Sequence, residues 1–198
     1  MPRRLAAVLL AKLCLLWVVI ASAALLILVV EGVNPYRMLL PVLGAAAVPA
    51  AEWGDGYLAH SALTAALVRS SGGEVRRIAW SGVPTDQSGM RAAIDLLKVE
   101  LVTAQAQGRA VWLLTHSLGS VIAYLALAEG GGRTPVETFV SLASPFGRPL
   151  ILQWLAQAHP GLLAEPLTAG VQGPAAMSIG RWLNVHTAWD PLGGPIRA

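Results

Sequence analysis

The chain has 198 residues, a length that suits one domain with an attachment. Hydrophobic residues make up 55% of it and charged residues only 13%, which is too apolar for an ordinary soluble protein. The formal net charge of +3 depends on Arg3, Arg4 and Lys12; without them 11 basic residues face 11 acidic ones, so no nucleic-acid partner is expected.

The first candidate element is an uncharged apolar run, Leu13–Val30, whose 18 residues are just enough to cross a bilayer. The cations precede it and Glu31 follows it, so the positive-inside rule places the N-terminus in the cytoplasm and the rest of the chain outside. The sequence thus predicts a single-pass membrane anchor and linker over 1–34 and a domain over 35–198. Two alternatives stay open: a signal peptide cleaved near Ala21-Ser22-Ala23, and a buried core helix.

Strand-like and helix-like segments alternate through the rest of the chain. Strands are expected at 38–43, 75–80, 111–115, 136–143 and 182–186, and helices at 59–69, 90–107, 118–129 and 149–159. Residues 44–56 and 160–180 are expected to be irregular, and a re-entrant or second membrane segment near 38–49 is an alternative. Such alternation predicts an α/β fold with a mostly parallel sheet flanked by helices.

A candidate nucleophile lies between the expected strand at 111–115 and the helix at 118–129. A serine at such a strand–helix turn, here Ser117, has the arrangement of a nucleophile elbow. The turn requires small residues two positions before and after the serine; Gly119 meets this requirement, and Thr115 stands where Gly is usual. The turn would also place the Leu118 N–H where an oxyanion forms. The alternative is an ordinary strand–helix turn.

From about Met38 to Asp190 the chain resembles the α/β-hydrolase superfamily, particularly its bacterial lipase- and esterase-like members. The resemblance rests on Gly44, Trp80-Ser81-Gly82, the Thr-His-Ser-Leu-Gly elbow, Leu142-Ala143-Ser144-Pro145, Trp182-Leu183-Asn184 and Asp190-Pro191. It implies Ser117 as nucleophile and Asp190 as the acid. It also implies two oxyanion donors, the Leu118 N–H and a backbone N–H near Gly44 or Ala45.

The histidine of the resembled family lies downstream of the acid, and residues 191–198 contain none. His186 ends the last expected strand and is the candidate substitute base. His116 is expected to line the pocket or fill the turn, His60 to lie at the surface or in packing, and His159 to end a helix. Without a base, Ser117 keeps its proton and is a poor nucleophile. The resemblance therefore implies a domain shortened at its C-terminal side.

Together these patterns predict a membrane-anchored serine hydrolase that cleaves a small-molecule or lipid ester through an acyl-enzyme on Ser117. The alternatives are a non-catalytic binding or structural domain of the same fold, and a truncated fragment. No metal or cofactor is expected, because the chain lacks nucleotide-binding Gly motifs and paired metal ligands. Cys14 is the single cysteine, so no disulfide is expected either. The sequence leaves the oligomeric state open.

Overall fold

A computed structural model describes residues 25–33, 56–131, 133, 135–162 and 177–186. Within them five strands form one parallel sheet in the order β2-β1-β3-β4-β5. The strands are β1 (Leu25–Val30), β2 (Glu74–Ile78), β3 (Ala110–His116), β4 (Val136–Leu142) and β5 (Ile179–Val185). The helices are α4 (Ala62–Ser71), α5 (Gln87–Ala106), α6 (Leu118–Glu129), α7 (Pro149–Ala158) and the short 3-10 helix η2 (Pro145–Gly147). The expected α/β class with a parallel sheet flanked by helices is confirmed.

The strand β1 overturns part of the membrane prediction. Leu25–Val30 is buried along its whole length between β2 and β3. An interior strand of a parallel sheet is covered on both faces and is therefore apolar at every position, which is also how the end of a membrane helix reads. The prediction of one membrane-spanning helix over Leu13–Val30 is wrong for these six residues. The sheet thus begins inside the segment 1–34 that the sequence assigns to the anchor.

The rest of the predicted anchor, residues 1–24, lies outside the described residues, as do the expected strand at 38–43 and Gly44 and Ala45. None of the helices in the described part of the chain is both long enough and apolar enough to cross a bilayer.

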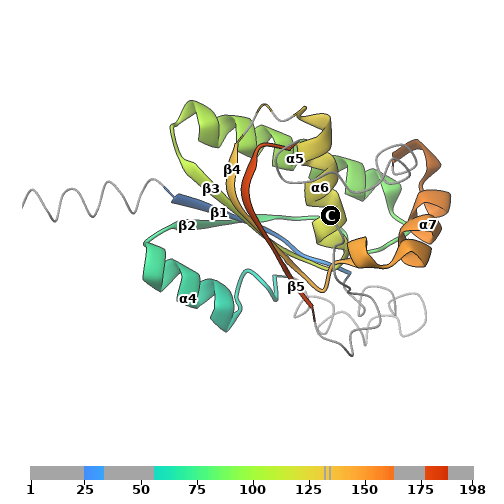
Figure 1. The fold of residues 1–198 in the computed structure, drawn as a ribbon, viewed down its shortest axis with the longest axis horizontal. Helices are drawn as coiled ribbons and strands as arrows, with labels where there is room; N and C mark the ends of the chain where they lie inside the picture. Colours follow the sequence, from blue (N-terminus) through green and yellow to red (C-terminus); the bar gives the residue numbers. More distant parts are fainter. Residues whose placement is uncertain (1–24, 34–55, 132, 134, 163–176, 187–198) are drawn as a thin grey trace, which may run out of the picture.

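Helices cover both faces of the sheet, with α4 on one side and α5 and α6 on the other (Figure 1). The β1 side chains alternate between the two cores: Leu26, Leu28 and Val30 join the α5–α6 core, and Leu25, Ile27 and Val29 join the α4 core. The helix α6 is buried over nearly all of its length because it lies between α5 and the sheet.

The start of α5 shows how local capping shifts an element boundary. The apolar spacing predicts this helix from Met90, but it begins at Gln87. Asp86 is its N-cap, and its carboxylate accepts the Gly89 N–H at 2.9 Å. A capping carboxylate satisfies one of the free N–H groups of the first turn, so the helix extends back into residues that read as a polar loop.

Because all the strand pairs are parallel, the carboxyl ends of the strands meet at one edge of the sheet. Glu31 and Gly32 follow β1, Ser117 follows β3, Ala143 follows β4 and His186 follows β5. In open parallel sheets this edge is where ligands bind, and both Ser117 and His186 lie along it.

Candidate active site

Ser117 occupies the single-residue connection between β3 and α6, and its backbone is strained. Its φ is 50° and its ψ −126°, in a region that side-chain-bearing residues rarely adopt. The Ser117 N–H donates to the Leu142 carbonyl at 2.8 Å, and the Ser117 carbonyl accepts the Ser120 N–H at 3.0 Å. Bonds to the neighbouring strand and to the first turn of α6 therefore hold this conformation. The Ser117 side chain is almost covered, with 8% of the residue exposed.

Two glycines allow the close packing around this serine. A Cβ on Gly119 would lie 2.3 Å from the Glu31 carbonyl oxygen and 2.4 Å from that of Val30. A Cβ on Gly32 would lie 2.8 Å from the Ser117 Cβ. All three distances are shorter than real Cβ contacts allow, so the start of α6 and Ser117 pack directly on the backbone that leaves β1. The small residue expected after the serine is present for this reason.

Thr115 shows why a larger residue is tolerated two positions before Ser117. Its hydroxyl donates to the Val140 carbonyl at 3.1 Å and hydrogen-bonds the Ser120 hydroxyl at 2.8 Å. Thr115 and Ser120 are both fully buried. A buried hydroxyl is tolerated when its hydrogen bonds are made, so the Thr115 side chain fits through this pairing with Ser120.

Leu118 is the first residue of α6, so its N–H belongs to the first turn, whose amides lack partners within the helix. The role of this amide as an oxyanion donor stays a prediction. The second predicted donor, Ala45, lies outside the described residues. The loop backbone that contacts Ser117 in the described part of the chain is that of Gly32, which follows a strand the sequence assigns to the membrane.

A buried carboxylate, Glu31, organises the surroundings of Gly32. Glu31 is 4% exposed, and its carboxylate accepts the N–H groups of Gly56, Leu58 and Ala59 at 2.7, 3.0 and 3.1 Å. Arg77 of β2 adds an ion pair at 3.2 Å. A buried charge is stable only when it is paired and hydrogen-bonded, and these four donors meet that condition. Glu31 thus fixes the 56–59 turn to the end of β1.

The 56–59 turn places the Tyr57 hydroxyl between Gly32 and His116, both of which are next to Ser117. The Tyr57 hydroxyl accepts the Gly32 N–H at 3.3 Å and lies 2.5 Å from Nδ1 of His116. The pKa of Tyr57 is raised to about 12, chiefly by burial and to a smaller extent by the Glu31 charge, while the Gly32 hydrogen bond opposes the rise. The tyrosine therefore keeps its proton near neutral pH. The sequence prediction that His116 fills the turn is refined: its ring packs edge-on against the Tyr57 ring.

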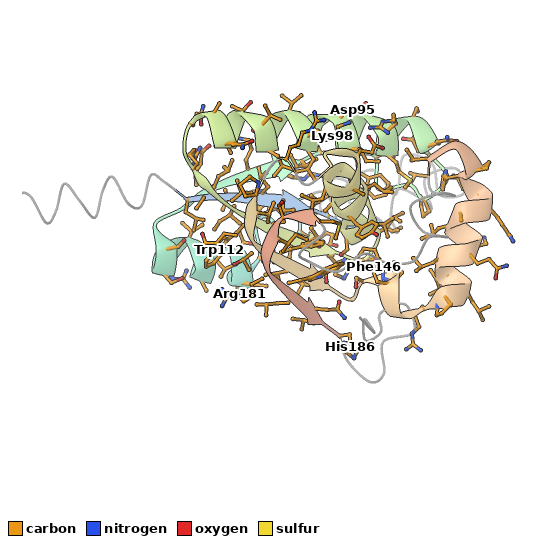
Figure 2. The ribbon with its side chains drawn as sticks, turned by 45° about the horizontal axis from the view of Figure 1, so that its top comes forward. Asp95, Lys98, Trp112, Phe146, Arg181 and His186 are labelled. Atoms are coloured by element: carbon orange, nitrogen blue, oxygen red, sulfur yellow. The ribbon has the colours of Figure 1, made fainter. Side chains whose placement is uncertain are left out.

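The histidine predicted as a substitute base, His186, is exposed at the carboxyl tip of β5 (Figure 2). No hydrogen bond among the described residues joins His186 to Ser117. Asp190, the predicted acid, lies outside the described residues. The structure therefore brings Ser117, Leu118 and His116 together and describes no contact between Ser117 and a predicted acid or base.

The other two histidines make no hydrogen bond to Ser117 among the described residues. His60 is exposed in the turn before α4 rather than inside the helix expected there. His159 is the C-cap of α7, as expected of a helix-end residue, and its Nε2 lies 2.6 Å from the Pro84 carbonyl oxygen. Within the described residues no group of three or more His, Cys, Asp and Glu side chains is placed to hold a metal ion.

Glu31 and Tyr57 are the site residues that sequence reasoning missed. The signal for Glu31 was a charge followed by Gly at the end of six consecutive apolar residues, which is typical of the end of a buried parallel strand. No comparable pattern marks Tyr57, because its position depends on contacts with residues 25 and 59 positions away.

Comparison with known proteins does not assign the chain to a family. No protein-family model matches the chain, and no curated protein matches it in sequence. Among solved structures, phospholipase PlaB from Legionella pneumophila in complex with thio-NAD is similar, with 14% sequence identity and a TM-score of 0.41. The match covers 81% of this chain but only 37% of the PlaB chain. A likeness at this level assigns neither a fold family nor an activity to the protein, so the proposals below rest on its own residues.

Proposed function

We propose that the protein is a serine hydrolase with an α/β-hydrolase-like fold, in which Ser117 attacks an ester carbonyl. The observation that carries this proposal is the backbone of Ser117, with φ 50° and ψ −126° between a buried parallel strand and a helix. A conformation of this kind costs about 1–3 kcal/mol and persists only where the surroundings enforce it. Gly would satisfy an ordinary turn without strain, so a serine held there by packing favours a role for its hydroxyl.

The proposed reaction forms an acyl-enzyme and then hydrolyses it. The Ser117 oxygen bonds to the carbonyl carbon, the carbon–oxygen bond to the alcohol breaks, and the serine proton leaves on the alcohol. Water then attacks the acyl group, which releases the carboxylic acid and restores the serine hydroxyl. The Leu118 N–H is the proposed first donor to the oxyanion. Asp190 and His186 are the proposed acid and base, and the substrate is a small-molecule or lipid ester.

A second candidate function is a non-catalytic domain that keeps the serine turn without a base. One observation favours it: the histidine next in sequence, His116, is engaged with Tyr57 through Nδ1. In addition, no hydrogen bond among the described residues connects any histidine to Ser117. A hydrolase would then need His186, which makes no hydrogen bond to Ser117 among the described residues, to approach the serine when substrate binds.

Labelling with a fluorophosphonate, which reacts only with activated serines, separates the two candidates. Ser117→Ala should abolish labelling of the folded full-length chain. Ser178→Ala is the matched control, because Ser178 also has a positive φ (53°) but precedes β5, at the opposite edge of the sheet. Labelling that Ser117→Ala removes and Ser178→Ala leaves intact supports the hydrolase, and His186→Ala then tests the base. Folded protein that does not label contradicts the hydrolase and supports the non-catalytic domain.

A further inference from the structure

The turn at 56–59 is tied to the end of β1 by a charge rather than by sequence proximity. The two segments are 25–28 residues apart, and the Glu31 carboxylate joins them through three backbone N–H groups. Hydrogen bonds to an ionised acceptor are about twice as strong as neutral ones. Arg77 supplies the compensating positive charge from β2. The position of Tyr57, within this turn, therefore depends on Glu31.

The Tyr57 hydroxyl connects the two backbone segments that flank Ser117. It binds the Gly32 N–H, on the loop that leaves β1, and Nδ1 of His116, at the end of β3. These two partners also approach each other, since a Cβ on Gly32 would lie 2.9 Å from Nδ1 of His116. The Tyr57 side chain thus links the loop after β1 to His116, the residue that precedes Ser117.

The Tyr57 hydroxyl takes part in both hydrogen bonds. Its oxygen accepts the Gly32 N–H, and in the contact with Nδ1 of His116 either the hydroxyl or the ring N–H donates, depending on the His116 tautomer. In either case the hydroxyl is the hydrogen-bond partner of Nδ1, so its loss changes the surroundings of that ring nitrogen.

We infer that Tyr57, held in place by Glu31, is a positioning residue that sets the second oxyanion donor relative to Ser117. The inference rests on the proposed hydrolase function. Tyr57 engages the Gly32 N–H, and the proposed second donor is another backbone amide of the same loop after β1. Removing one oxyanion donor reduces kcat by about 10²–10³-fold, and a displacement of about 1 Å reduces it by about 10²-fold. Loss of the Tyr57 hydroxyl should therefore slow chemistry at Ser117 with little effect on substrate affinity.

The test compares Tyr57→Phe with the wild-type chain and with Tyr124→Phe. Tyr57→Phe removes only the hydroxyl and keeps the ring that packs on His116. Tyr124→Phe is the matched control because Tyr124 is also buried, with its ring against Phe146 and Trp182. Tyr57→Phe should lower the maximal rate of fluorophosphonate labelling tenfold or more without raising the probe concentration at half-maximal rate. Tyr124→Phe should keep the wild-type rate.

Glu31→Gln shows whether Glu31 acts through Tyr57. By itself this change should also slow labelling, because a neutral amide holds the 56–59 turn less strongly. Combined with Tyr57→Phe it should slow labelling no further, since residues that act through one another are not additive. A purely structural role of Glu31 predicts additive losses instead.

A spectroscopic measurement reads the same hydrogen bond independently of labelling. The imidazole ¹⁵N shift of His116 Nδ1 should differ between the wild-type chain and Tyr57→Phe, because the variant lacks the hydroxyl that contacts Nδ1. Unchanged shifts, or an unchanged labelling rate in Tyr57→Phe, would overturn the positioning role while leaving the hydrolase proposal intact. A wild-type chain that does not label at all would overturn the hydrolase proposal and this inference together.

Discussion

Gly32 and Ser117 lie so close together that a Cβ on Gly32 would approach the Ser117 Cβ to 2.8 Å. The same Cβ would meet the His116 carbonyl oxygen at 2.9 Å. The loop after β1 and the turn after β3 therefore pack tightly against each other, although Gly32 and Ser117 are far apart in sequence.

Gly32→Ala should destabilise the protein by about 1–3 kcal/mol, since an added methyl group in a filled site forces the neighbouring backbone to move. The change should also slow fluorophosphonate labelling at Ser117. Chemical denaturation measures the free energy of unfolding. Gly161→Ala is the control, because its Cβ would meet only Gln87 Nε2, at an ordinary 3.6 Å. Equal stability of the two variants would contradict the close packing.

Thr115→Val should destabilise the protein by about 1–3 kcal/mol, because it leaves the buried Ser120 hydroxyl without the Thr115 partner while keeping the side-chain shape. The double variant Thr115→Val, Ser120→Ala should lose less than the sum of the two single variants, since both ends of the hydrogen bond are then apolar. Denaturation midpoints of the four proteins complete the cycle. Strict additivity would show that the Thr115–Ser120 pair does not stabilise the turn.

The ion pairs between α5 and α6 should make stability depend on acidic pH. Hydrogen bonding to Arg91 and Lys98 lowers the pKa of Glu129 to about 2, although its partial burial opposes this. Because the pKa is lower in the folded than in the unfolded state, the Glu129 contribution to stability is present above about pH 4.5 and is lost as pH falls towards 2.

Glu129→Gln should therefore flatten the fall of the unfolding free energy between about pH 4.5 and 2. Thermal unfolding across that pH range measures the slope. Glu137→Gln serves as the control, because Glu137 is exposed on β4 and forms no ion pair within the described residues. If Glu129→Gln and Glu137→Gln show the same pH dependence of the unfolding free energy, the Arg91–Glu129 pair does not contribute to stability in this pH range.

Membrane attachment stays a prediction. It now concerns residues 1–24 alone, because Leu25–Val30 form the strand β1. The uncharged remainder, Leu13–Ala24, has 12 residues, fewer than the roughly 20 that span a bilayer as a helix. We expect the full chain to stay with membranes after an alkaline carbonate wash and a variant lacking residues 1–24 to be released. Release of both proteins would contradict attachment through this segment.

Periodicity predicted most of the described elements because their cores are local in sequence. The apolar residues and the glycines that follow them predict a helix at 118–129, and α6 spans Leu118–Glu129. The serine turn could be predicted for the same reason: strand, turn and helix are adjacent in the chain.

β1 and Tyr57 could not be predicted in this way. A strand buried on both faces has no alternation, so its apolar run reads equally well as membrane. The contacts of Tyr57 depend on the sheet order, which places β1 between β2 and β3 and brings the turn at 56–59 beside His116. The predicted second donor near Gly44 or Ala45 stays a prediction, because both residues lie outside the described part of the chain.

The central place of β1 also affects the order of folding during synthesis. Its register pairs Leu26–Val30 with β2 and Leu25–Val30 with β3, which ends at residue 116. At about 5–20 residues per second, the ribosome makes β3 on the order of ten seconds after β1. Throughout that interval a six-residue apolar strand lacks one of its two neighbours. The nascent chain thus exposes this apolar strand before β3 is made, and its yield in cells should depend on chaperones that shield such segments until β3 emerges.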